Sequence, residues 1–197
     1  EVGAYALDAP GHGQSGGDFL TVPVYSSVIR RAILQLGSVH TVISHSIGSF
    51  SLLYTLFRFP LLPVKRVIAL APPGEATDFV NAFKITLGLS RKVVRLVEEQ
   101  FVDQYDVKPD FFSAVKFASH LNMKGLIIHD EEDREAPYAY ATSIHQAWKR
   151  STLITTKGFG HNLRSSLVVG HVVDFISADG ETAHPAGTRH PASHERI

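Results

Sequence analysis

Apolar residues along this chain form two kinds of segment. Short runs rich in Val, Ile and Leu are typical of buried strands. Such strands are predicted at residues 2–8 and 41–44, and within residues 64–74, 125–133 and 151–160. Segments with apolar residues every three or four positions indicate helices. These helices are predicted at residues 22–36, 48–57, 137–149 and 164–177. Strands that alternate with helices predict an α/β fold with a mainly parallel sheet.

Residues 75–120 interrupt this alternation. They contain three helical pieces and no strand, and Ser90 is a plausible N-cap for the middle piece. A helical insertion between two strands can cover a pocket, so we expect a lid here, the alternative being ordinary helical filling. The core is then formed by residues 1–74 and 121–178.

The last residues, 179–197, are polar, contain Pro and Gly and show no periodicity, so we predict a disordered tail. Its histidines, His184, His190 and His194, lack the spacing of a metal site.

Composition narrows the class of protein. A chain of 197 residues with 44% apolar and 19% charged residues fits one globular domain. Nineteen basic and nineteen acidic residues balance, which argues against a nucleic-acid partner. The absence of cysteine excludes disulfides, thiolate metal sites and a cysteine nucleophile. No apolar run approaches the ~18 residues of a membrane span.

The stretch "HTVISHSIGSFSLLYTLF", residues 40–57, places small residues at a strand-to-helix junction. Ser44, Gly48 and Ser49 would let the chain turn sharply, and Ser46 lies in the middle of that turn. A nucleophile elbow holds an exposed serine hydroxyl in this way. On its own, this pattern fits a plain turn serine equally well.

A serine nucleophile needs a base beside it and an acid that orients the base. The segment "GLIIHDEEDREAP" offers Asp130 and Asp133, and "TTKGFGHNL" offers His161. Both follow predicted strands, and parallel strands present their carboxyl ends at one edge of a sheet. The residues alone leave both carboxylates open, because an acidic run is often only a solvated surface.

Four motifs together resemble the α/β-hydrolase superfamily, in its branch of small lipases and esterases. "LDAPGHGQSGG" resembles the D-x-P-G-H-G-x-S turn, and "SHSIGS" the G-H-S-x-G-G elbow. "IIHDEEDREAP" resembles the H-G-x-x-D-x-x-V-P acid segment, and "GFGH" the histidine loop. The resemblance covers about residues 4–176 and implies an α/β-hydrolase fold: a parallel sheet flanked by helices, with a small helical lid.

The resemblance implies a role for each matching residue. Ser46 is the nucleophile, His161 the general base and then acid, and Asp133 the residue that orients His161. The backbone N–H of Ile47 is one oxyanion donor. The spacing to Pro137 favours Asp133 over Asp130 as the acid. No cofactor and no metal are implied.

The chain departs from the family pattern in two ways. Ser44, Ser49 and Asp130 stand where glycine is usual. The sequence also lacks a strand that the family has ahead of the one at 2–8. In the family's sheet that strand lies between the strands corresponding to 2–8 and 41–44, and its H-G loop supplies a second oxyanion donor. We therefore expect a fragment of a longer hydrolase, with early strands missing.

Other candidate residues have structural interpretations. His12, His45 and His129 are expected to be structural, with His45 packed against the sheet and directed away from Ser46. The "GHGQSGG" turn lacks the lysine of a phosphate-binding loop. Six phenylalanines of the insertion line an acyl pocket or only hold the lid together: Phe79, Phe83, Phe101, Phe111, Phe112 and Phe117.

The predicted function is a serine hydrolase that acts on a small-molecule carboxylic ester or related acyl substrate. A thioester, an amide or a carbon–carbon bond could be cleaved by the same three residues. The alternatives are a non-catalytic binding protein of the same fold and an inactive fragment. A cytoplasmic location is expected, and the oligomeric state is left open.

Overall fold

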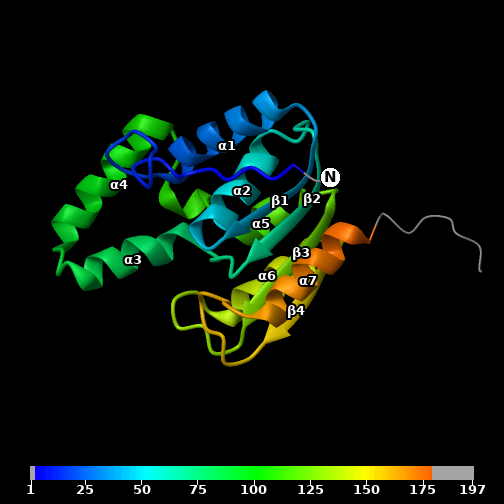
Figure 1. Cartoon of the computed structure of the whole chain (residues 1–197). Helices are drawn as coiled ribbons and strands as arrows, with labels where there is room; N and C mark the ends of the chain where they lie inside the picture. The colour runs from blue at the N-terminus through cyan, green and yellow to red at the C-terminus, as the bar shows by residue number, and fades with distance from the viewer. Residues whose placement is uncertain (1–2, 179–197) are drawn as a thin grey trace, which may run out of the picture.

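Residues 3–178 are described by the computed structural model (Figure 1). The sheet has four parallel strands in the order β1-β2-β3-β4. They are β1 (Val39–His45), β2 (Val64–Leu70), β3 (Lys124–Asp130) and β4 (Ser151–Thr156). Strands that are neighbours in the chain are neighbours in the sheet, so the predicted α/β architecture is confirmed. The predicted disordered tail lies outside the described residues.

The four predicted connecting helices are present, with ends within three residues of those predicted. They are α1 (Val22–Leu36), α2 (Ile47–Arg58), α6 (Tyr138–Ala147) and α7 (Ser166–Ser177). Local chemistry sets their ends: the Thr21 hydroxyl accepts a hydrogen bond from the Val24 N–H, and Gly37 with φ +79° ends α1.

Alternating side chains of the central strands build two cores. Val67 of β2 and Ile127 of β3 pack into the larger core, which α1, α2 and α6 cover. Their chain neighbours Ile68 and Ile128 point to the opposite face, where α7 packs (Figure 1). A sheet buried on both faces explains why these strands are continuous apolar runs.

The insertion contains α3 (Ala76–Thr86), α4 (Arg91–Tyr105), the 3₁₀ turn η1 (Pro109–Phe111) and α5 (Ala114–Ala118). Ser90 caps α4 as predicted, because its hydroxyl accepts from the Val93 N–H. Figure 1 shows α3 and α4 extending away from the sheet, and neither helix has a buried residue. By contrast, α5 packs on α2 and α6 and buries Phe117 completely.

The predicted strand at residues 2–8 is wrong for the described part, residues 3–8, which form no strand. Tyr5 is 79% exposed and Leu7 44% exposed. A strand needs a neighbour for its backbone hydrogen bonds, and among the described strands β1 pairs only with β2. The apolar pattern is therefore present, but the partner that would convert it into a strand is not among these residues.

No helix within residues 3–178 has both the length and the apolar character needed to cross a membrane.

Two glycine-to-alanine changes are expected to have opposite effects on stability. A Cβ on Gly125 of β3 would lie 2.3 Å from the buried Trp148 ring. Gly125→Ala should therefore lower the free energy of unfolding by about 1–3 kcal/mol through overpacking. Gly170→Ala in α7 meets no atom within 4 Å and should raise it by about 0.5–1 kcal/mol. Urea unfolding followed by the fluorescence of Trp148 measures both. Equal stabilities of the two variants would contradict the packing described here.

Candidate active site

Ser46 occupies the junction at which β1 ends and α2 begins. Its backbone has φ +52° and ψ −126°, a conformation that residues other than glycine rarely adopt. Backbone bonds hold it there, because the Ser46 N–H donates to the Leu70 carbonyl at 2.9 Å. Ser49 is fully buried, and its hydroxyl donates to the same carbonyl at 3.2 Å. The small residues in this turn therefore allow the elbow to lie against the end of β2.

The structure brings together the three side chains predicted from the sequence. The Ser46 Oγ lies 2.8 Å from Nε2 of His161, and Nδ1 of His161 lies 2.8 Å from Oδ2 of Asp133. His161 follows β4 and Asp133 follows β3, so all three come from the carboxyl edge of the sheet. The result is one continuous hydrogen-bonded chain of hydroxyl, imidazole and carboxylate.

The environment of Asp133 keeps its carboxylate ionised. Burial acts to raise the pKa of Asp133, but hydrogen bonds outweigh it and hold the pKa below its usual value. The backbone N–H groups of Glu135 and Ala136 donate to Oδ1 at 2.8 and 2.9 Å, and His161 contacts Oδ2. An ionised Asp133 accepts the Nδ1 proton of His161, which leaves Nε2 as the acceptor for the Ser46 hydroxyl.

His129 contacts the same carboxylate, although no motif in the sequence indicates this contact. It is fully buried, and its Nε2 lies 2.8 Å from the Ala136 carbonyl and 3.1 Å from Oδ2 of Asp133. A carbonyl can only accept, so Nε2 carries the proton. Burial lowers the pKa of His129, so the ring is a neutral donor to Asp133.

His45 lies elsewhere than expected. The prediction that it packs against the sheet is wrong: its ring lies 4.9 Å from that of His161, and its Nε2 donates to the His161 carbonyl at 2.8 Å. The reason is that the loop after β4 extends along the carboxyl ends of the strands as far as β1, where it meets the last residue of that strand. His45 thus supports the backbone of His161.

Asp130, the second candidate acid, is bonded to groups other than the His161 ring. Its carboxylate is fully buried and accepts hydrogen bonds from Thr156, Gly158 and Phe159. The geometry therefore favours Asp133 as the partner of His161, as the spacing to Pro137 predicted.

The glycine-rich turn after residue 8 has a structural explanation. The Asp8 carboxylate accepts from the Gln14 N–H at 2.9 Å, and a Cβ on Gly13 would lie 2.4 Å from that carboxylate. The Asp8 carboxylate therefore occupies the space inside the turn in which a bound phosphate would have to lie. His12 donates from Nδ1 to the Pro10 carbonyl at 2.9 Å.

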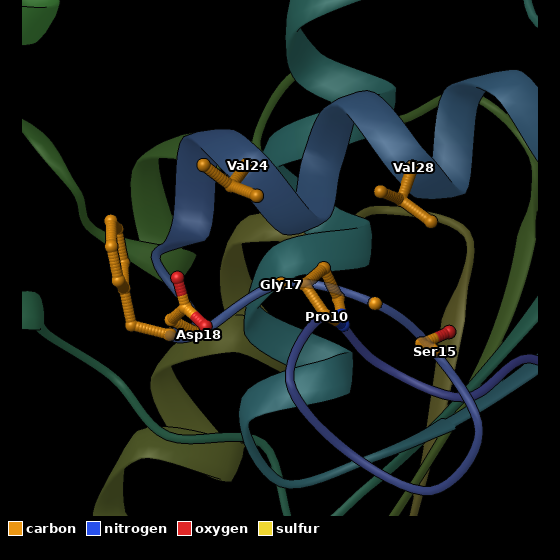
Figure 2. A pocket seen from close by; sticks show the side chains of 8 residues that line it. Pro10, Ser15, Gly17, Asp18, Val24 and Val28 are labelled. Carbon is orange, nitrogen blue, oxygen red and sulfur yellow. The ribbon is translucent and has the colours of Figure 1, made fainter.

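A hollow of about 510 Å³ lies between this turn and α1 (Figure 2). Pro10, Ser15, Asp18, Val24 and Val28 are among the residues that line it. None of Ser46, Asp133 and His161 lines it, so the hollow is separate from the site at the strand ends.

The arrangement is suited to acyl transfer. Ile47 is the first residue of α2, and the first N–H groups of a helix have no partner within it. An anion formed beside Ser46 could therefore accept from the Ile47 N–H. Within residues 3–178, no group of three or more His, Cys, Asp or Glu side chains is placed to hold a metal ion.

Comparison with known proteins identifies the family. The model of the family described as the alpha/beta hydrolase family matches residues 1–188. No protein of curated function matches the sequence. Because the family model covers most of the chain, the chain belongs to the alpha/beta hydrolase family.

Solved structures of low sequence identity share the fold. MGS-M2, an alpha/beta hydrolase from a Medee basin deep-sea metagenome library, is 14% identical with a TM-score of 0.63, covering 92% of this chain and 80% of that chain. The meta-cleavage product hydrolase CumD from Pseudomonas fluorescens IP01 is 14% identical with a TM-score of 0.60, covering 88% and 79%. Est1E from Butyrivibrio proteoclasticus, with ferulic acid bound, is 18% identical with a TM-score of 0.62, covering 88% and 74%.

The backbone of Ser46 predicts a stability difference between two variants that both lack the hydroxyl. Ser46→Gly should be more stable than Ser46→Ala by about 1 kcal/mol, because glycine adopts the positive φ without strain. At the exposed Ser27 of α1 the order should reverse, since glycine is a poor helix former. Urea unfolding of the four variants tests this. Finding the same order at both positions would refute a strained elbow.

The buried His129 predicts a pH-dependent stability. Its pKa is lower in the folded chain than the ordinary value of about 6.5, so the unfolded chain binds the proton more readily. This contribution to stability is complete above about pH 6.5 and is lost as the pH falls towards the folded pKa. The urea concentration at the unfolding midpoint should therefore decrease when the pH is lowered from 7.5 to 5.5.

His129→Gln should reduce that fall, because glutamine can donate to the Ala136 carbonyl without titrating. His120→Gln is the control, because His120 is exposed, and it should leave the fall unchanged. An equal fall in wild type and His129→Gln would assign the pH dependence to other groups.

Proposed function

We propose that this member of the alpha/beta hydrolase family is a serine hydrolase that cleaves a carboxylic ester or a related acyl compound. The observation that carries the proposal is the unbroken chain of contacts from Ser46 through both nitrogens of His161 to Asp133, each 2.8 Å long. A hydroxyl alone is a weak nucleophile at neutral pH, and a base at hydrogen-bond distance is what activates it.

In the first half of the reaction the Ser46 Oγ attacks the carbonyl carbon of the substrate. His161 accepts the hydroxyl proton at Nε2, and Asp133 stabilises the imidazolium that results. The Ile47 N–H donates to the oxyanion of the tetrahedral intermediate. His161 then gives the proton to the leaving alcohol as the C–O bond breaks, which leaves the acyl group on Ser46.

In the second half, water attacks the acyl-enzyme. His161 removes a proton from the water and returns it to the Ser46 Oγ when the acid product leaves. The neutral His129 and the backbone donors to Asp133 keep the carboxylate in one orientation throughout both halves. The proposed cycle ends with the same protonation states with which it began.

The insertion is proposed to act as a lid, formed mainly by α3 and α4. The aromatic residues of the insertion do not all face a possible substrate. Phe112 and Phe117 are fully buried against α2, where they contribute to packing. Phe79 of α3 packs edge-on against Phe50 of α2, with 5.8 Å between ring centroids. The exposed apolar side chains of α3 and α4, such as Phe83 and Leu96, favour a substrate with an apolar acyl or aryl group.

The direct test is covalent labelling with a fluorophosphonate probe, which reacts with activated serine hydroxyls. The chain should be labelled, and Ser46→Ala should reduce labelling to background. Asp133→Asn should slow labelling by about 10²–10⁴-fold, because the histidine loses its orienting carboxylate.

Ser44→Ala is the matched control, because Ser44 lies two residues before the nucleophile, in β1. The Ser44 hydroxyl donates to the Ile68 carbonyl at 3.1 Å, so this variant should still label. A folded wild-type chain that resists the probe, or a Ser46→Ala variant that labels equally well, would exclude the proposed reaction and favour a binding function.

A further inference from the structure

The carboxylate of Asp130, which the proposed reaction does not use, lies at the end of β3. It is fully buried and accepts four hydrogen bonds. The N–H groups of Glu132 and Gly158 donate to Oδ1 at 3.0 and 3.2 Å. The Thr156 hydroxyl and the Phe159 N–H donate to Oδ2, both at 2.9 Å. Each oxygen is therefore fully occupied.

These donors come from two different turns. Glu132 belongs to the turn that carries Asp133, and the Asp133 N–H itself donates to the Asp130 carbonyl at 3.2 Å. Gly158 and Phe159 belong to the turn that carries His161. One buried carboxylate thus joins the turn of the proposed acid to the turn of the proposed base.

The turn before His161 needs such a restraint. Gly158 and Gly160 have φ of +84° and +58°, and an added Cβ at either position would meet no atom within 4 Å. Glycines in open space have a large backbone freedom in the absence of other contacts. The bonds to Asp130 fix two successive peptide groups in this turn, within three residues of His161.

We infer that Asp130 is a positioning residue, which holds the turn of His161 in register with Asp133 so that Nδ1 meets the carboxylate and Nε2 meets Ser46. This inference rests on the proposed function. The matching position of the family motif is usually glycine, which has no side chain to form these bonds.

The charge of Asp130 fits this role. Burial acts to raise the pKa of Asp130, but the hydrogen bonds from Phe159, Thr156 and Glu132 outweigh it, so the pKa lies below the ordinary value. An ionised carboxylate only accepts, and all four neighbours donate. Asparagine has nearly the same shape, but its NH₂ group replaces one of the two oxygens. The position of Oδ2 suits the NH₂ better, because the Thr156 hydroxyl there can become an acceptor, whereas Oδ1 faces two backbone N–H groups. The Phe159 N–H at Oδ2 can only donate, so it loses its acceptor.

The test compares Asp130→Asn with Glu132→Gln, which removes the same charge from the same turn. The Glu132 side chain is exposed and reaches Lys157 at 3.9 Å through solvent, a contact of little energetic value. Hydrogen exchange of the Gly158 and Phe159 amides reports the restraint without any catalysis. The second measurement is the turnover of p-nitrophenyl butyrate, divided by the number of sites that react with the fluorophosphonate probe. It reports the effect of the restraint on catalysis in those molecules whose Ser46 is reactive.

In Asp130→Asn we expect the Phe159 amide to exchange at least about tenfold faster. We expect kcat per titrated site to fall about 10–100-fold, since a small displacement of a catalytic group has effects of this size. KM should change by less than about twofold, because the substrate contacts remain. Glu132→Gln should match wild type in all three measurements.

A second pair keeps the inference testable if Asp130→Asn does not fold. Thr156→Val removes one donor with little change of shape, and Thr156→Ser restores the hydroxyl. Thr156→Val should lower kcat per site by a few-fold, about 2–5-fold for one weakened bond, and Thr156→Ser should recover it.

Three results would overturn the inference. Unchanged Phe159 exchange in Asp130→Asn would refute the restraint. Faster exchange or a lower urea midpoint with unchanged kcat per titrated site would leave Asp130 a merely structural residue. A wild-type chain that neither labels nor cleaves esters, yet shows the exchange contrast, would refute the proposed function and with it the catalytic meaning of the restraint.

Discussion

The parallel register of the four strands is the constraint on which the site depends. It aligns His45 with Leu70, and Asp130 with Thr156, so every strand ends at one edge of the sheet. Residues 115 positions apart, Ser46 and His161, then need only short turns to come within hydrogen-bond distance. The apolar runs that drive strand burial therefore also determine where the polar groups gather, although they take no part in the proposed chemistry.

Burying polar groups at the carboxyl edge of the sheet costs free energy, and hydrogen bonds from the surrounding turns offset that cost. Ser46 adopts a strained backbone, and the imidazole of His129 and the carboxylates of Asp130 and Asp133 are buried at the end of β3 and in the turn that follows it. Buried carboxylates are tolerated only when their oxygens are satisfied. Backbone N–H groups do most of this for Asp130 and Asp133, and they are rigid donors because the turns fix them. The turn after β3 thus folds around both acids, and the turn after β4 donates to Asp130.

Periodicity was sufficient for the helices and for β1 to β4, because both depend on burial that the local pattern encodes. It failed at residues 3–8, where a strand-like pattern has no partner within the described chain. It also could not place His45, His129 or Asp130, whose contacts depend on turn geometry and on residues up to 116 positions away. The contacts among Ser46, Asp133 and His161 could be anticipated because the motifs that carry them resemble the hydrolase motifs in order and spacing.

Spacing favours Asp133 over Asp130 as the partner of His161, but it does not explain why only one of the two carboxylates can take that place. Asp130 and Asp133 are chemically identical and three residues apart. The difference lies in how many acceptor positions each turn consumes. The turn of Asp133 directs two N–H groups to Oδ1 and leaves Oδ2 to His161 and His129. Both oxygens of Asp130 are already engaged by the surrounding turns. A carboxylate with no acceptor position left cannot orient an imidazole. The two roles proposed for these acids therefore follow from the hydrogen-bond donors around each carboxylate rather than from the carboxylates themselves.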